Sequence, residues 1–157
     1  MDVAQLIDML SQAQYSIPVG DGVLLHPEAL MGNGRWVQYK RRFSSTGDGD
    51  NGGGVHYEIG LMETGRYRDQ VVVDLHVEHG TRPDILVQLR EHLPPIDRRG
   101  ARVLLDPGYA CAELIVHGAE YSRDWIRRSS FKTIFGLITK DMSKLYQAVE
   151  PKLAELE

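Results

Sequence analysis

Two stretches, Val55–Leu61 (VHYEIGL) and Gln70–Glu78 (QVVVDLHVE), alternate between apolar and polar side chains and decide the fold. Alternation with a period of two places one face of a strand on a core and the other in water, which is typical of an antiparallel sheet. The loop 63–69 between them is centred on Gly65, a residue suited to turns. The two stretches therefore predict an antiparallel hairpin.

The segments on either side predict the remainder of the sheet and its helices. We expect a helix over the first residues to about Gln14, and another over 82–93, which Pro94 ends. Residues 1–157 are interpreted as a single α+β domain with an antiparallel sheet of about five strands and helices on one face, in the order α-β(3-4)-α-β-β-α. Further strands are expected over 23–25, 35–43, 102–105 and 110–116, and a glycine-rich hairpin tip over 44–54.

The last third of the chain predicts one long amphipathic helix over about 122–156, or two helices in line. Apolar side chains recur at steps of three and four from Phe131 to Leu156, and Pro151 is expected to kink or restart the helix because it lacks a backbone N–H. This stripe exceeds what a small sheet covers, so part of it is expected to pack on another subunit. The residues expected on this partner or dimer surface are Trp36, Tyr39, Phe131, Phe135, Ile138, Met142 and Leu145.

Length and composition restrict the class of protein. The 157 residues are 42% apolar and 25% charged, which is ordinary for one globular domain and excludes a collagen-like or disordered chain. No apolar run approaches the roughly 20 residues that span a bilayer. The N-terminus lacks a signal-peptide pattern, and a single cysteine fits a reducing compartment, so a cytoplasmic protein without a membrane partner is expected. The net charge of −4 argues against nucleic acid as a partner, since that binding relies on neutralising phosphates.

The polar face of the predicted hairpin gathers residues that can hold a metal ion. If the two strands pair with an even register sum, one face of the sheet carries His56, Glu58, Asp74, His76 and Glu78, of which the first four form the predicted metal set. Imidazoles and carboxylates within cross-strand reach could hold zinc or manganese, or supply an acid and a base. Alternation requires polar residues on this face in any case, so a solvated face without a cofactor is the first interpretation. An odd register sum would break up the group.

The predicted elements also follow one another in a known order. An opening helix around Leu6 and Leu10 precedes three strands between 35 and 78, a helix over 82–93, a hairpin over 102–116 and the closing stretch FKTIFGLITKDMSKLYQAVEPKLAEL, residues 131–156. This order resembles that of the class I chaperones of type III secretion, over most of the chain and at the level of topology. The resemblance implies a homodimer that holds an extended segment of another protein, through apolar grooves and strand addition at an open sheet edge.

No catalytic motif accompanies these features. The chain lacks a GxSxG elbow, a phosphate-binding loop, a dinucleotide fingerprint and an HExxH pair, so no catalytic residue is assigned. We therefore expect a non-enzymatic, chaperone-like protein-binding domain that holds an extended segment of a partner protein. The alternative is a metal-dependent hydrolase, acting for example on phosphodiesters, whose zinc or manganese ion is held by the cluster on the sheet face.

Overall fold

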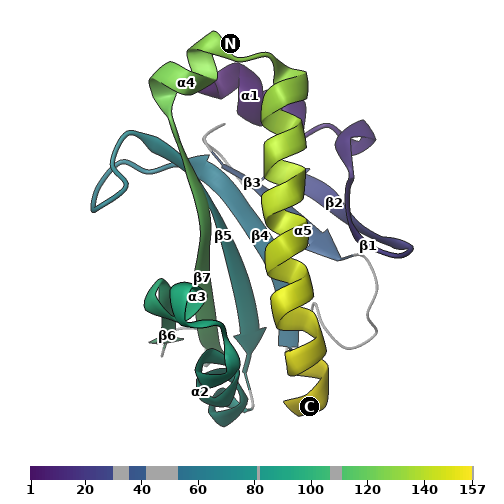
Figure 1. The fold of residues 1–157 in the computed structure, drawn as a ribbon, viewed down its shortest axis with the longest axis vertical. Helices are drawn as coiled ribbons and strands as arrows, with labels where there is room; N and C mark the ends of the chain where they lie inside the picture. The colour runs from purple at the N-terminus through teal and green to yellow at the C-terminus, as the bar shows by residue number, and fades with distance from the viewer. Residues whose placement is uncertain (30–35, 42–52, 81, 107–110, 157) are drawn as a thin grey trace.

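The computed structural model describes residues 1–29, 36–41, 53–80, 82–106 and 111–156, and shows a seven-stranded antiparallel sheet crossed by one long helix (Figure 1). The strands are β1 (Ile17–Gly20), β2 (Val23–Ala29), β3 (Trp36–Arg41), β4 (Gly53–Leu61), β5 (Gln70–His79), β6 (Ala101–Asp106) and β7 (Cys111–Ser122). The helices are α1 (Val3–Leu10), the 3₁₀ turn η1 (Ala13–Tyr15), α2 (Pro83–His92), α3 (Pro95–Arg99), α4 (Arg123–Arg128) and α5 (Phe131–Leu156).

The first five strands form an antiparallel meander, and the last two strands, β6 and β7, extend the sheet beyond β5. Its order is β1-β2-β3-β4-β5-β7-β6, so β7 pairs with both β5 and β6, and β6 forms an edge. Helices α2 and α3 carry the chain from β5 to β6. The connection between β4 and β5 turns at Gly65, whose φ of 84° disfavours any residue with a Cβ. The predicted hairpin therefore stands at the centre of a larger sheet.

Helix α5 runs along one face of the sheet and forms the core with it (Figure 1). On the face toward α5, the central side chains of β4 and the apolar ones of β5 are buried, as the alternating pattern predicts, while Val55 and Leu61 are partly buried. Two buried tyrosines tie the layers together through their hydroxyls. Tyr57 donates to the carbonyl of Met142 in α5, and Tyr39 donates to the carbonyl of Leu10 in α1, both at 2.6 Å. These bonds satisfy polar groups inside an apolar core.

The α+β class and the antiparallel sheet are confirmed, but the sheet has seven strands in place of about five. The strand β1 is not predicted by the sequence because it is short and contains Pro18, which a strand tolerates at an edge. Strand β2 extends beyond the expected residues 23–25 to Ala29, and the short helix α3 follows Pro94. The observed order therefore has five strands before α2. It also has the short helix α3 before the hairpin of β6 and β7, and the separate short helix α4 after it.

The sequence predicts one long helix or two helices in line over about 122–156, whereas the structure has two helices that are not in line, because α4 lies at an angle to α5 (Figure 1). Helix α4 ends at Arg128, and α5 begins after Ser130, whose Oγ accepts a hydrogen bond from the backbone N–H of Thr133. Helix α5 then continues through Pro151 to Leu156, although the sequence predicts a kink or a restart at the proline.

Two other expectations fall partly on residues that the structure does not describe. Of the glycine-rich tip expected over 44–54, Gly53 and Gly54 belong to β4, and the other residues lie outside the described ranges. The strands expected over 35–43 and 110–116 likewise begin or end outside these ranges, although β3 and β7 account for their described parts.

Four residues expected on a partner or dimer surface are instead buried in the chain's own core. Tyr39, Ile138, Met142 and Leu145 all pack between α5 and the sheet or against α1, and the first three have no exposed surface. The physical reason is the size of the sheet: seven strands cover the apolar stripe that about five would leave open. No helix in the described part of the chain is long and apolar enough to cross a membrane.

The remaining three residues of that expected surface are half-buried. Phe131 and Phe135 stack on each other at a centroid distance of 5.5 Å, and both meet the ring of Tyr15 edge-on. Trp36 lies across Gly60 of the neighbouring strand, so closely that a Cβ at Gly60 would fall 2.1 Å from the indole. These aromatic side chains therefore also have partners within the chain.

Candidate metal centre

The register of β4 and β5 places the predicted histidines directly opposite each other. His56 pairs with His76, and Glu58 pairs with Asp74, so the register sum is even and all four side chains lie on the same face of the sheet. This face is the one opposite α5, because the alternate residues Tyr57 and the apolar side chains of β5 point into the core. The condition set by the sequence analysis is therefore met.

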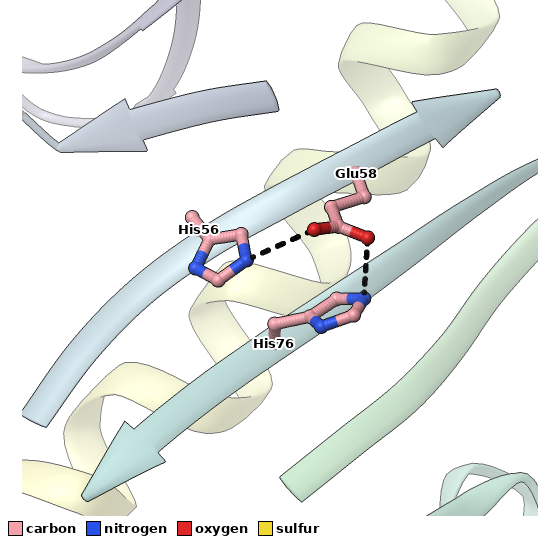
Figure 2. Close-up of side chains that lie close together, drawn as sticks. All are labelled: His56, Glu58 and His76. Carbon is pink, nitrogen blue, oxygen red and sulfur yellow. Dashed lines mark ion pairs between the residues drawn. The ribbon is translucent and has the colours of Figure 1, made fainter. Parts of the chain in front are cut away.

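Three of the four residues converge (Figure 2). The imidazoles of His56 and His76 stack with centroids 4.9 Å apart, and both direct Nε2 toward the carboxylate of Glu58. The distance from His56 Nε2 to Glu58 Oε1 is 3.5 Å, and that from His76 Nε2 to Glu58 Oε2 is 3.3 Å. Only 6% of His56 and 8% of His76 is exposed, which is unusual for polar side chains outside the main core.

Two further carboxylates surround these histidines. Glu113 of β7 lies with Oε1 2.5 Å from His76 Nδ1, the ring nitrogen that faces away from Glu58. Glu78 of β5 pairs with Glu113 across the strands. His56, Glu78 and Glu113 form a second set whose donor atoms, like those of His56, Glu58 and His76, all lie within 4.8 Å of one another. The sequence predicts Glu78 on this face but outside the metal set, and it does not predict Glu113 there.

The charges of this cluster favour the ionised forms of Glu58 and His76. Burial raises the pKa of Glu58, but a hydrogen bond with His56 and the charges of His76 and His56 outweigh it, so the pKa lies below its ordinary value. Burial lowers the pKa of His76, but the hydrogen bond that its Nδ1 donates to Glu113 and the charges of Glu58, Glu113 and Asp74 more than compensate, and the pKa is raised. The two glutamates therefore favour a proton on the imidazole that lies between them.

The donor set and its spacing fit a zinc ion. Zinc binds histidine nitrogen and carboxylate oxygen at about 2.0–2.2 Å, and two such ligands in a tetrahedral arrangement lie about 3.4 Å apart. The distances from His56 Nε2 to Glu58 Oε1 and from His76 Nε2 to Glu58 Oε2 are close to this value, although they run to the two different oxygens of the carboxylate. In addition, the carboxylate of Glu113 behind His76 is the outer partner that metal-bound histidines commonly have, since it orients the ring and raises its basicity.

Asp74, the fourth predicted ligand, takes part in a different group on the same face. Its Oδ1 lies 2.9 Å from His117 Nδ1, while Glu120 Oε2 lies 2.6 Å from His117 Nε2. The ring of Tyr67 stacks on His117 with centroids 4.2 Å apart and 13° between the planes. Both ring nitrogens of His117 are thus occupied by carboxylates, and Asp74 does not join the donor set of His56, Glu58 and His76.

A bulge in β7 brings this second group together. The register of β5 and β7 shifts between Val73 and Asp74, where β7 contains the additional residue Gly118. Without it, His117 and Glu120, three positions apart, would point to opposite faces. A Cβ at Gly118 would lie 2.8 Å from the Val73 carbonyl oxygen, so the bulge requires glycine.

Protonation of His117 is expected to make stability depend on pH. Burial lowers its pKa, but the hydrogen bonds and charges of Asp74 and Glu120 outweigh it, and the pKa is raised above 6.5. The stabilising contribution is complete below pH 6.5 and is lost as the pH rises through the folded-state pKa. We expect the unfolding free energy of the wild type to decrease over this interval by more than that of His117→Gln, measured by urea denaturation in EDTA.

The wild-type curve includes His76, whose pKa is also raised, and the difference between the two curves isolates His117. Parallel curves for the wild type and His117→Gln would contradict the assignment.

The fold and the site define an α+β protein in which the sheet face opposite the long helix carries a histidine–carboxylate cluster. A scan against protein-family models and searches of curated proteins and solved structures found no match for the chain.

Proposed function

We propose that this protein binds a divalent metal ion of the zinc class at His56, Glu58 and His76, and that it acts as a metal-dependent hydrolase. The observation that carries the proposal is the position of the Glu58 carboxylate between two buried imidazoles that both present Nε2 to it. Three protein ligands of this kind leave the fourth position of a tetrahedral ion to water, which is the arrangement of catalytic zinc sites.

The access of water to Glu58 and the position of Glu113 behind His76 support hydrolytic chemistry. Glu58 retains 26% side-chain exposure, so water can reach the ligand set from the open side of the sheet. A zinc ion lowers the pKa of bound water to about 7 and polarises a carbonyl or phosphoryl oxygen. Glu113 would hold the proton of His76 Nδ1 and thereby keep Nε2 directed at the ion.

The direct test is a calorimetric titration of the chelator-treated protein with zinc, and then with manganese. We expect one zinc ion per chain and an affinity that increases between pH 6 and 8, because His76 must lose its proton to bind the metal. Zinc at about 100 times its Kd should raise the free energy of unfolding by about 2.7 kcal/mol. Absence of saturable binding at pH 8 would contradict the proposal.

A second candidate is the protein-binding function that the resemblance to secretion chaperones implies, and one specific observation favours it. In the described part of the chain, five large apolar side chains are exposed, and three of them, Val87, Ile96 and Leu104, lie on α2, α3 and β6. These elements lie together at the β6 edge of the sheet (Figure 1). An edge strand offers unpaired backbone groups to an added strand, and the apolar side chains would be buried beside it.

If this edge joins two copies of the chain, the protein is a dimer whose association depends on Leu104. Light scattering during size exclusion should then give about twice 17.7 kDa for the wild type and about 17.7 kDa for Leu104→Lys. Leu24→Lys, at an exposed position near the opposite edge, is the matched control and should remain dimeric. A monomeric wild type at high concentration would contradict a homodimer formed at β6.

A further inference from the structure

A hollow on the same sheet face lies beside the metal cluster without including its ligands. It has a volume of about 290 Å³, close to the lower end of small-molecule sites, which is about 300 Å³. The loop between β4 and β5 forms one wall, and β5, β7 and the start of β6 form the floor and the other wall. Its lining residues include Met62, Arg66, Tyr67, Val72, Arg102 and Ile115.

Two apolar side chains form part of the floor where alternation predicts polar ones. Val72 and Ile115 lie on the face opposite α5, yet they are only 1% and 8% exposed. In the sequence they break the alternating pattern, as the middle residues of the runs 71–73 and 114–116. Both side chains are therefore already covered by neighbouring residues of the chain, and the part of Ile115 that remains exposed is the apolar surface that the floor offers to a small molecule.

Two guanidinium groups stand at this hollow without acidic partners. Within the described ranges, neither Arg66 nor Arg102 lies within 4.0 Å of a carboxylate, whereas Arg68, Arg82 and Arg90 each do. The Arg66 guanidinium carbon lies 5.6 Å from the centroid of the Tyr67 ring. An arginine that no carboxylate neutralises is suited to receive the oxygens of an anion.

The stacked pair of Tyr67 and His117 forms the wall behind these arginines. His117 lies between Asp74 and Glu120 and is covered by the Tyr67 ring, so its position is set by three contacts. The carboxylate of Asp74, the single one in the lining, is thus paired with His117, whereas Arg66 and Arg102 have no carboxylate partner within the described ranges. The hollow is therefore positively charged in a protein whose net charge is −4.

From this geometry we infer that the hollow binds a small organic anion, with its phosphate or carboxylate group on Arg66 and Arg102 and its apolar part against Ile115. The forked guanidinium matches both kinds of oxyanion, because each presents two oxygens at the required spacing. The site does not need the metal ion. It lies one residue pair along the sheet from the cluster, since Asp74 lines the hollow and His76 belongs to the metal set.

The test is a calorimetric titration of the full chain in EDTA with phenyl phosphate, benzoate, inorganic phosphate and, as the uncharged probe, benzyl alcohol. We expect phenyl phosphate or benzoate to bind one molecule per chain, and benzyl alcohol not to bind. Whichever of the first two binds more tightly identifies the acidic group. Arg102→Gln should weaken this binding by about tenfold or more, as expected for the loss of a hydrogen bond to a charged group.

Arg68→Gln is the control for the loss of an arginine. Arg68 belongs to the same loop as Arg66, but it lies beside Asp69 and does not line the hollow, so this variant should bind the anion as the wild type does. Ile115→Asn should weaken the binding of phenyl phosphate more than that of inorganic phosphate, since only phenyl phosphate has an apolar part. Failure of both organic anions to bind the wild type, or unchanged binding by Arg102→Gln, would overturn the inference. Binding that requires zinc would also overturn it, and would assign the anion to the metal centre instead.

Discussion

Replacement of His76 by alanine is expected to weaken zinc binding by more than about 100-fold in the calorimetric titration. In the proposed metal site His76 would supply one of the three ligand atoms, and its Nε2 lies 3.3 Å from Glu58 Oε2. Loss of an outer partner alone typically weakens a metal site by about 10–100-fold, so loss of a ligand should exceed this range. Glu113→Gln, which alters the partner of His76 Nδ1, should accordingly fall within about 10–100-fold.

His92→Ala is the control for this series, because His92 is exposed and its Nδ1 faces the Gln88 carbonyl of its own helix. It should bind zinc as the wild type does. Glu58→Gln preserves the shape of the ligand and removes its charge, and it tests the site independently if His76→Ala folds poorly. Wild-type zinc affinity in both His76→Ala and Glu58→Gln would refute the metal centre.

Replacement of Ile138 by alanine is expected to lower the free energy of unfolding by about 2–5 kcal/mol and to leave the molecular mass in solution unchanged. Ile138 belongs to α5 and is fully buried between this helix and the sheet, so the shortened side chain leaves a cavity that the packed core cannot close. The free energy is measured by urea denaturation in EDTA, and the mass by light scattering.

Leu137 is the neighbouring residue on the same helix and is 38% exposed, so Leu137→Ala should change stability by less than about 1 kcal/mol. This pair separates the two roles of the apolar stripe. If Ile138→Ala retained wild-type stability but changed the molecular mass, the stripe would be an interface between chains and the packing described above would be wrong.

The hairpin, and the part of the histidine–carboxylate cluster that lies on β4 and β5, follow from the local alternation of the sequence. Alternation over 55–61 and 70–78 indicates two paired strands, and the parity of the numbers places His56 and His76 on one face once the strands pair evenly. The turn at Gly65 adds the connection between them. These features depend on residues close together in the sequence, where the period of a strand is sufficient to decide which side chains are neighbours.

The remainder of the cluster depends on a strand that returns from far along the chain. Glu113 reaches His76 because β7 is inserted between β5 and the edge strand β6, a placement that no hairpin rule predicts. The sequence signals that could have identified the second group are the break in alternation at Val72 and the glycine at position 118. Both mark positions where the sheet face or the register departs from the simple pattern.

By itself, the sequence determined the α+β class and the central antiparallel hairpin, because side-chain alternation is a local property of a strand. It placed His56, Glu58 and His76 on one face only on the condition of an even register, which the tertiary structure supplies. Only the tertiary structure decided that Asp74 pairs with His117, that Glu113 joins the histidines, and that the stripe of α5 is covered by the chain's own sheet. Those contacts depend on the order of strands and on one bulge, which are set by packing between distant segments.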